Sequence, residues 1–141
     1  MKNIDTLLFP RWIIPVEPHN VYHEHYALAM HGGRIVDILP QEKAKELYQA
    51  NHIIQLPNHV VLPGFINAHA HSPMTLLRGL ADDLALMDWL NNHIWPVEKK
   101  YLSEQFVQDG TELAFVEMLR CGTIGFNEHY FFYETIAETT D

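Results

Sequence analysis

Two histidines one residue apart, His69 and His71, are the side chains of this sequence whose type and spacing point most directly to chemistry. They follow the apolar run Val60–Leu62 and the pair Pro63–Gly64. Alternate residues of a β-strand project to the same side, so both imidazoles can point to one place. Two such nitrogens at about 2.0–2.1 Å suit zinc. The pair therefore predicts two ligands of a divalent metal or, alternatively, two polar side chains on a half-exposed strand.

Other polar groups are candidates for completing such a site, because a catalytic zinc normally has three protein ligands and an open position. Glu128 and His129 follow a second expected strand and can approach the same edge of the sheet. His93 lies in an expected helix, and His23-Glu24-His25 repeats the spacing in a hairpin strand. We expect solvent-facing positions for His93 and for this hairpin segment.

The composition limits the classes of partner. The chain has 141 residues and a formal net charge of −9, without a basic stripe, which argues against a nucleic-acid partner. A single cysteine, Cys121, excludes an internal disulfide and fits a reducing compartment. Residues Met1–Asp5 lack the apolar segment of a signal peptide, and no apolar run approaches the ~20 residues of a membrane span. We expect a cytoplasmic protein with no membrane partner.

The elements before the histidine pair are expected to form a small antiparallel β unit with one short helix. The glycine pair in His31-Gly32-Gly33 predicts a tight hairpin turn. The expected strands cover residues 22–30, 34–39, 53–56 and 59–62, and the expected helix covers residues 41–50.

After Pro63 the pattern changes to strand, helices, strand and helix, which is typical of a parallel α/β fold. The expected strands cover residues 65–70 and 123–126, and the expected helices cover residues 88–101, 103–121 and 134–141. Two strands cannot close a barrel, so we expect the first quarter of an α/β barrel after a β unit. The chain looks truncated.

The run VVLPGFINAHAHSPMTLLRGLADDLALMDWL, followed by WPVEKKYLS, resembles the amidohydrolase superfamily. Within it, the match is to the methylthioadenosine/S-adenosylhomocysteine deaminases, relatives of the triazine chlorohydrolases. The resemblance implies a metal-dependent (β/α)8 TIM barrel, whose first βα units are residues 63–141. It also implies that residues 1–62 belong to a small β-sandwich-like domain built from both chain ends.

The resemblance also implies roles for individual residues. His69 and His71 correspond to two zinc ligands at the end of the first barrel strand, with ferrous iron as the alternative metal. Glu98 corresponds to the acidic residue that binds the ribose hydroxyls of the substrate. Trp89 and Trp95 either wall the nucleoside pocket or pack in the core. The remaining ligands and the acid/base residues of the family would lie on strands beyond Asp141.

The implied reaction is the hydrolytic deamination of an adenine nucleoside to its inosine analogue and ammonia. The expected substrate is 5′-methylthioadenosine, S-adenosylhomocysteine or adenosine, and association into a homo-oligomer is left open. Glu128 and His129 depart from the group, in which an aspartate and a methionine often occupy these places. Two alternatives therefore remain: an amidohydrolase acting on a free base or a chlorotriazine, and a catalytically incomplete fragment without activity of its own.

Overall fold

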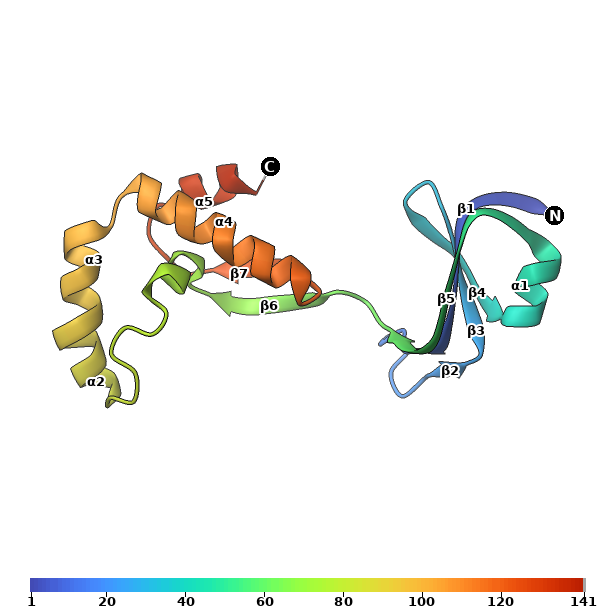
Figure 1. The fold of residues 1–141 in the computed structure, drawn as a ribbon, viewed down its shortest axis with the longest axis horizontal. Helices are drawn as coiled ribbons and strands as arrows, with labels where there is room; N and C mark the ends of the chain where they lie inside the picture. The colour runs from blue at the N-terminus through green and yellow to red at the C-terminus, as the bar shows by residue number, and fades with distance from the viewer. Residues whose placement is uncertain (141) are drawn as a thin grey trace. The chain divides into compact units, whose positions relative to one another are not determined.

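The computed structural model describes residues 1–140, and the chain divides into two compact units, Met1–Pro63 and Gly64–Asp141. The first unit is rich in strands, and the second combines strands with helices (Figure 1). The chain is therefore of mixed α/β class, as the sequence predicts. No helix within residues 1–140 is long and apolar enough to cross a membrane.

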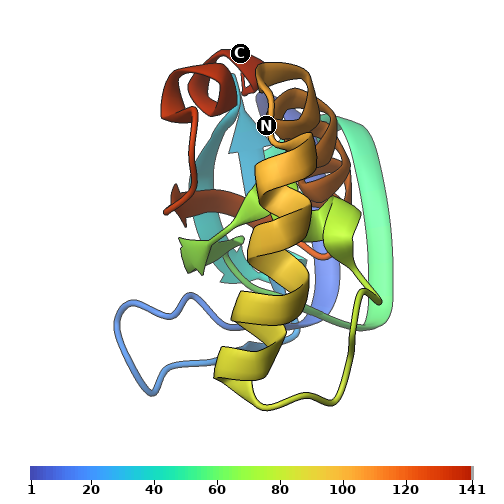
Figure 2. The same cartoon turned by 90° about the vertical axis from the view of Figure 1, so that its left-hand side faces the viewer.

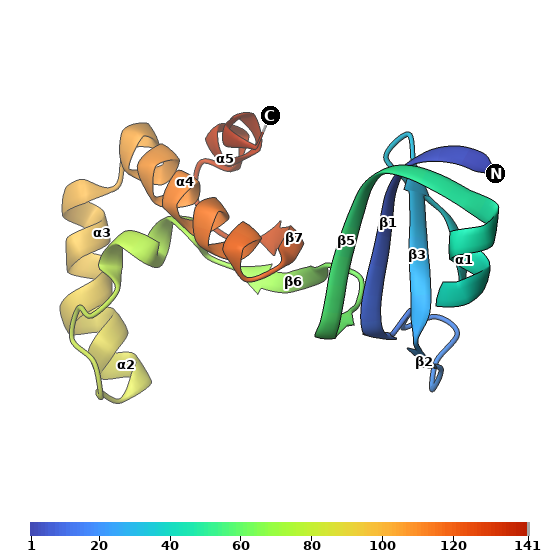
Figure 3. The same cartoon turned by 45° about the vertical axis from the view of Figure 1, so that its right-hand side comes forward.

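The first unit is one mixed sheet accompanied by one helix. Its elements are β1 (Lys2–Ile13), β2 (His23–Glu24), β3 (Tyr26–His31), β4 (Arg34–Pro40), α1 (Gln41–Leu47) and β5 (Tyr48–Val61). The strand order is β2-β1-β3-β4, and β5 pairs with the other edge of β1. Strand β1 consequently runs between β3 and β5 (Figure 3).

The predicted hairpin turn is confirmed, and the strand before it is shorter than predicted. Gly32 and Gly33 both have positive φ angles, of 58° and 72°, which glycine adopts without steric cost and which suit a two-residue turn. The expected strand over residues 22–30 is divided at His25, whose φ is 56°. As a result β2 pairs only with the end of β1, at Trp12 and Ile13.

The prediction of a purely antiparallel unit is wrong, because β5 pairs in parallel with β1. Helix α1 separates β4 from β5 and provides the crossover that a parallel pair requires. The two short strands expected around Pro57 are one continuous strand. A register shift opposite Pro10–Trp12 accommodates residues 57–59, so Pro57 does not end the strand.

The core of the first unit is a cluster formed by strands of this sheet and by α1, which contributes Ala44. Its buried members are small or aliphatic side chains and one aromatic ring, which come mainly from the central strands: Ile4, Leu7, Phe9, Ala27, Ala29, Leu39 and Ala44. Tyr48 and Ala50 of β5 pack against this cluster.

The second unit follows the predicted order of strand, helices, strand and helix. Its elements are β6 (Phe65–Ala70), η1 (Ser72–Leu77), α2 (Leu86–Trp89), η2 (Leu90–Ile94), α3 (Trp95–Tyr101), α4 (Glu104–Arg120), β7 (Thr123–Glu128) and α5 (Tyr133–Thr139). Strands β6 and β7 pair in parallel, so their carboxyl ends lie at the same edge of the sheet. The helix predicted over residues 134–141 corresponds to α5, and Asp141 lies outside the described residues.

The helix predicted over residues 88–101 begins earlier, at Leu86, and contains a π-helical turn. Elements α2, η2 and α3 form one continuous helical run, yellow to orange in Figure 2. Pro96 stands in the first turn of α3, directly after the π-helical segment. A proline has no N–H to give to the preceding turn, and the wider turn before it accommodates this loss without a break.

Helix α4 has the boundaries that its sequence predicts. Ser103 caps its start, where the side-chain oxygen accepts a 3.1 Å hydrogen bond from the N–H of Phe106. Gly122, with a φ of 80°, follows the helix end. In the middle of the helix, Gly110 lies directly against Pro73 of η1, where an added Cβ would be 2.5 Å from the carbonyl oxygen of Pro73. The glycine therefore permits α4 to approach the segment that follows the histidine pair.

Candidate functional site

The histidine pair lies at the carboxyl end of β6. His69 is in the strand and His71 directly follows it, at the start of η1. The two Nε2 atoms are 3.0 Å apart, and both side chains are exposed. The chain therefore brings these two nitrogens to one point, from positions two residues apart on an extended backbone.

The separation of the two Nε2 atoms is close to the spacing of two nitrogens that bind one zinc ion. Two zinc–nitrogen bonds of about 2.1 Å at a tetrahedral angle place their nitrogens roughly 3.4 Å apart. The observed separation of 3.0 Å is close to that value. Within residues 1–140, no group of three or more His, Cys, Asp or Glu side chains is arranged to hold a metal ion. The donor set thus fits two of the three protein ligands that a catalytic zinc uses.

A third imidazole, that of His129, stacks on the ring of His69. Its ring centroid is 4.5 Å from that of His69, with an interplanar angle of 30°. Asn127 supports it, since the amide Nδ2 lies 3.1 Å from Nε2 of His129 and also donates to the carbonyl of Ala68. His129 follows β7, so the parallel pairing of β6 and β7 accounts for this approach.

Glu128 is directed to backbone amides. Its Oε2 accepts a 2.9 Å hydrogen bond from the N–H of Ser72, and its Oε1 accepts one of 2.9 Å from the N–H of His129. The carboxylate therefore ties the segment after β6 to the end of β7. The sequence predicts that Glu128 and His129 approach the histidine pair. Glu128 binds backbone N–H groups beside the pair, and His129 stacks its ring on that of His69.

A cavity of about 300 Å³ opens beside His71 and brings most of the predicted site residues together. It is lined by polar groups and by aromatic and aliphatic side chains: His71, Met74, Trp89, Leu90, Ile94, Trp95, Glu98, His129, Tyr130 and Phe131. Trp95 is 48% exposed, so much of its indole remains accessible. His69 and His93 are not among the lining residues, and His23–Glu24 belongs to the first unit.

Glu98 is the buried carboxylate of this cavity, with only 8% of its surface exposed. The hydroxyl of Tyr130 donates a hydrogen bond of 2.5 Å to its Oε1. Burial, followed by this hydrogen bond and the charge of Glu98, raises the pKa of Tyr130 well above its usual value. The phenol, which is protonated at neutral pH as an ordinary tyrosine is, acts as a donor. Sequence reasoning missed Tyr130, which follows β7 and His129 directly.

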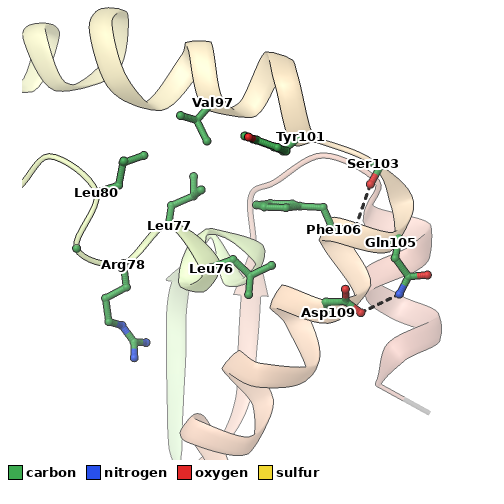
Figure 4. A pocket seen from close by; sticks show the side chains of 11 residues that line it. Leu76, Leu77, Arg78, Leu80, Val97, Tyr101, Ser103, Gln105, Phe106 and Asp109 are labelled. Carbon is green, nitrogen blue, oxygen red and sulfur yellow. Dashed lines mark hydrogen bonds between the residues drawn. The ribbon is translucent and has the colours of Figure 1, made fainter.

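A larger cavity, of about 680 Å³, lies between η1, α3 and α4 (Figure 4). Leu77, Val97 and Phe106 point into it, whereas Arg78 points away. The side chain of Arg78 instead makes two hydrogen bonds to Glu117, of 2.9 and 2.6 Å. No histidine lines this cavity, so size alone does not locate the chemistry.

The chain is similar to known proteins in sequence and in structure. Residues 60–141 match the sequence profile of the Amidohydrolase family. The chain is 47% identical over 133 residues to a 5-methylthioadenosine/S-adenosylhomocysteine deaminase of Saccharophagus degradans, covering 94% of this chain and 30% of that protein. It is 53% identical over 100 residues to a 5′-deoxyadenosine deaminase of Methanocaldococcus jannaschii, covering 71% of this chain and 24% of that protein.

Among solved structures, the chain resembles an adenosine deaminase from Xanthomonas campestris with bound zinc. The TM-score is 0.91 at 46% sequence identity, covering 98% of this chain and 31% of that one. The chain therefore spans about 30% of the length of the proteins that it matches over nearly its whole sequence.

Proposed function

Because the chain belongs to the amidohydrolase family, we propose that the whole protein is a metal-dependent hydrolase that deaminates an adenine nucleoside. The products are the inosine analogue and ammonia. The proposed substrates are 5′-methylthioadenosine, S-adenosylhomocysteine and adenosine. Relatives named as deaminases of such nucleosides, at 47% and 53% identity, support this choice.

The observation that carries the proposal is that His71 and Glu98 line one cavity of about 300 Å³. A carboxylate accepts hydrogen bonds and can bind two vicinal hydroxyls, such as those of a ribose. In this proposal the imidazole of His71, which lines the same cavity, would hold the metal beside the bound nucleoside. 5′-Methylthioadenosine and adenosine are uncharged and need no basic pocket, which agrees with the net charge of −9.

In this proposal His69 and His71 hold one divalent metal, with zinc as the expected ion and ferrous iron as the alternative. The 3.0 Å separation of their Nε2 atoms supports a shared ion, as does the zinc in the similar adenosine deaminase structure. A divalent metal supplies Lewis acidity and activates water as a nucleophile at neutral pH.

The other residues of the cavity bind and orient the substrate. Glu98 accepts the ribose hydroxyls and thereby fixes the position of the adenine ring relative to the histidine pair. Trp89 and Trp95 line the same cavity and offer apolar faces to the purine. Together these contacts would exclude water from the nucleoside.

The wider architecture of the proposal follows from the two-stranded sheet. We propose that β6 and β7 are the first two strands of a (β/α)8 barrel formed by residues from 63 onward. Active sites of such barrels are built at the carboxyl ends of the strands, where His71 and His129 lie. Residues 1–62 would contribute to a sandwich-like domain.

The proposal can be tested with the full-length protein loaded with zinc. We expect release of ammonia from 5′-methylthioadenosine, S-adenosylhomocysteine or adenosine. Guanine and a chlorotriazine serve as comparison substrates, because neither has ribose hydroxyls for Glu98. Turnover of either of these, without turnover of any adenine nucleoside, would refute the proposal.

A further inference from the structure

Tyr130 connects the two chemical parts of the cavity. Its hydroxyl donates to Oε1 of Glu98 at 2.5 Å, and its ring meets that of His71 edge-on, with centroids 6.2 Å apart at 86°. Glu98 comes from α3, whereas Tyr130 follows β7, 32 residues later in the chain. One side chain thus contacts both the buried carboxylate and an imidazole of the histidine pair.

The contact matters because Glu98 has a long side chain in a largely buried place. A glutamate has several rotatable bonds, and a buried carboxylate requires hydrogen bonds to remain charged. Tyr130 supplies a charge-assisted hydrogen bond to one oxygen, which is among the stronger kinds. Among residues 1–140, no hydrogen bond engages the second oxygen, Oε2. The carboxylate is therefore fixed at one end and free to accept at the other.

We propose that Tyr130 is a positioning residue that holds Glu98 for the ribose hydroxyls and so determines selectivity for nucleosides with an intact 2′,3′-diol. This inference rests on the function proposed above. Without the phenolic hydroxyl, Glu98 keeps its place on α3 but loses the partner that selects its conformation. Diol recognition then weakens, while binding of the purine is unaffected.

The test compares two substrates in the full-length protein, 5′-methylthioadenosine and its 2′,3′-dideoxy analogue. In Tyr130→Phe we expect the KM for the diol substrate to rise about tenfold, or about 1.4 kcal/mol. The kcat for that substrate should change by less than about threefold, and the KM for the dideoxy analogue should stay the same. A purely structural role would raise both KM values together.

Two further variants sharpen the result. Tyr133→Phe removes a hydroxyl three residues away from a side chain that is 72% exposed, and it should leave both KM values unchanged. In a Glu98→Gln background, Tyr130→Phe should have little additional effect on diol selectivity, because the two residues act as one unit.

The possible failures are distinguishable. An unmodified protein that deaminates neither substrate would refute the proposed function, and the present inference with it. An active protein in which Tyr130→Phe leaves the preference for the diol unchanged would overturn the role of Tyr130 alone.

Discussion

The backbone N–H of Ser72 donates a 2.9 Å hydrogen bond to the carboxylate of Glu128. Ser72 follows β6, and Glu128 is the last residue of β7. The same carboxylate accepts from the N–H of His129, so one side chain holds the backbone on both sides of the histidine cluster formed by His69, His71 and His129. The contact fixes the segments that carry the imidazoles, without involving the imidazoles themselves.

We expect Glu128→Ala to loosen this connection. The variant leaves the Ser72 amide without its acceptor, and the loss of such a bond costs about 1–3 kcal/mol of the free energy of unfolding. Glu128→Gln keeps an acceptor oxygen and should cost less. Chemical denaturation of the metal-free, full-length protein measures both. Glu134→Ala, at an exposed position of α5, is the control, and an equal loss in the control would contradict the role of Glu128.

The converging nitrogens of His69 and His71 lead us to expect that the metal content depends on both residues. His69→Ala and His71→Ala should each lower the metal-to-protein ratio of the full-length protein severalfold, because each removes one of two converging nitrogens. Elemental analysis after dialysis measures the ratio. His59→Ala replaces an exposed histidine of β5 and should retain the metal. Full metal content in both pair variants would rule out the assignment.

Glu98 makes a prediction about substrate binding. Glu98→Gln removes the charge but keeps the size, and hydrogen bonds to a charged group contribute about 1.5–3 kcal/mol. We expect the KM for adenine nucleosides to rise at least about tenfold. Steady-state kinetics with 5′-methylthioadenosine provides the measurement, and Glu104→Gln in the exposed first turn of α4 provides the control. An unchanged KM would show that Glu98 does not bind the ribose hydroxyls.

Gly110 of α4 packs so closely against Pro73 that we expect no larger side chain to fit there. An added Cβ would lie 2.5 Å from the carbonyl oxygen and 2.8 Å from the Cα of Pro73, which are backbone atoms that cannot rotate away. Gly110→Ala should therefore destabilise the protein by about 1–3 kcal/mol, despite the better helix propensity of alanine. Urea denaturation measures the change. Gln108→Ala, exposed on the same helix, should stay within about 0.5 kcal/mol.

The ion pair between Arg78 and Glu117 should make the stability of the protein depend on pH. The hydrogen bonds and charge of Arg78 lower the pKa of Glu117 below its model-compound value of 4.5. A lowered folded-state pKa stabilises the protein above pH 4.5, and this contribution is lost as the pH falls through the folded-state pKa.

In Glu117→Gln, the Tm should consequently depend less steeply on pH in the acid range. Thermal unfolding at low salt, from neutral pH to about pH 3, measures the difference. Both side chains are partly exposed, so added salt should reduce the effect. Identical acid slopes in the two proteins would argue against this contribution.

The sequence predicts the local parts of the structure well. The bounds of β6, the bounds of α4 and the turn at Gly32-Gly33 follow from residue type and spacing within a few positions. The sequence does not predict the parallel pairing of β1 with β5. The two strands are far apart along the chain, and local sequence patterns do not show which strands pair. The π-helical turn before Pro96 was missed for a related reason, since periodicity does not report small changes of helical pitch.

In the candidate site, too, the sequence predicts individual residues but not the contacts between distant ones. His69, His71 and Glu98 stand out by spacing or by resemblance, and His71 and Glu98 line one cavity. Tyr130 does not stand out, because a tyrosine after a strand is ordinary until the fold brings its hydroxyl to a buried carboxylate. The contact between Tyr130 and Glu98 depends on how the fold brings the segment after β7 to the cavity that Glu98 lines.

The parallel pairing of β1 with β5 also sets an order of events during synthesis. The hairpin of β3 and β4 and its antiparallel pairing with β1 need only the first 40 residues, whereas β5 pairs Tyr48 with Lys2 and Val61 with Ile13. Such long-range parallel pairing closes slowly. Until Val61 has left the ribosome, one edge of β1 is bare and open to other strands. We therefore expect β5 to act as the last strand to join, completing the first unit only as the second begins to emerge.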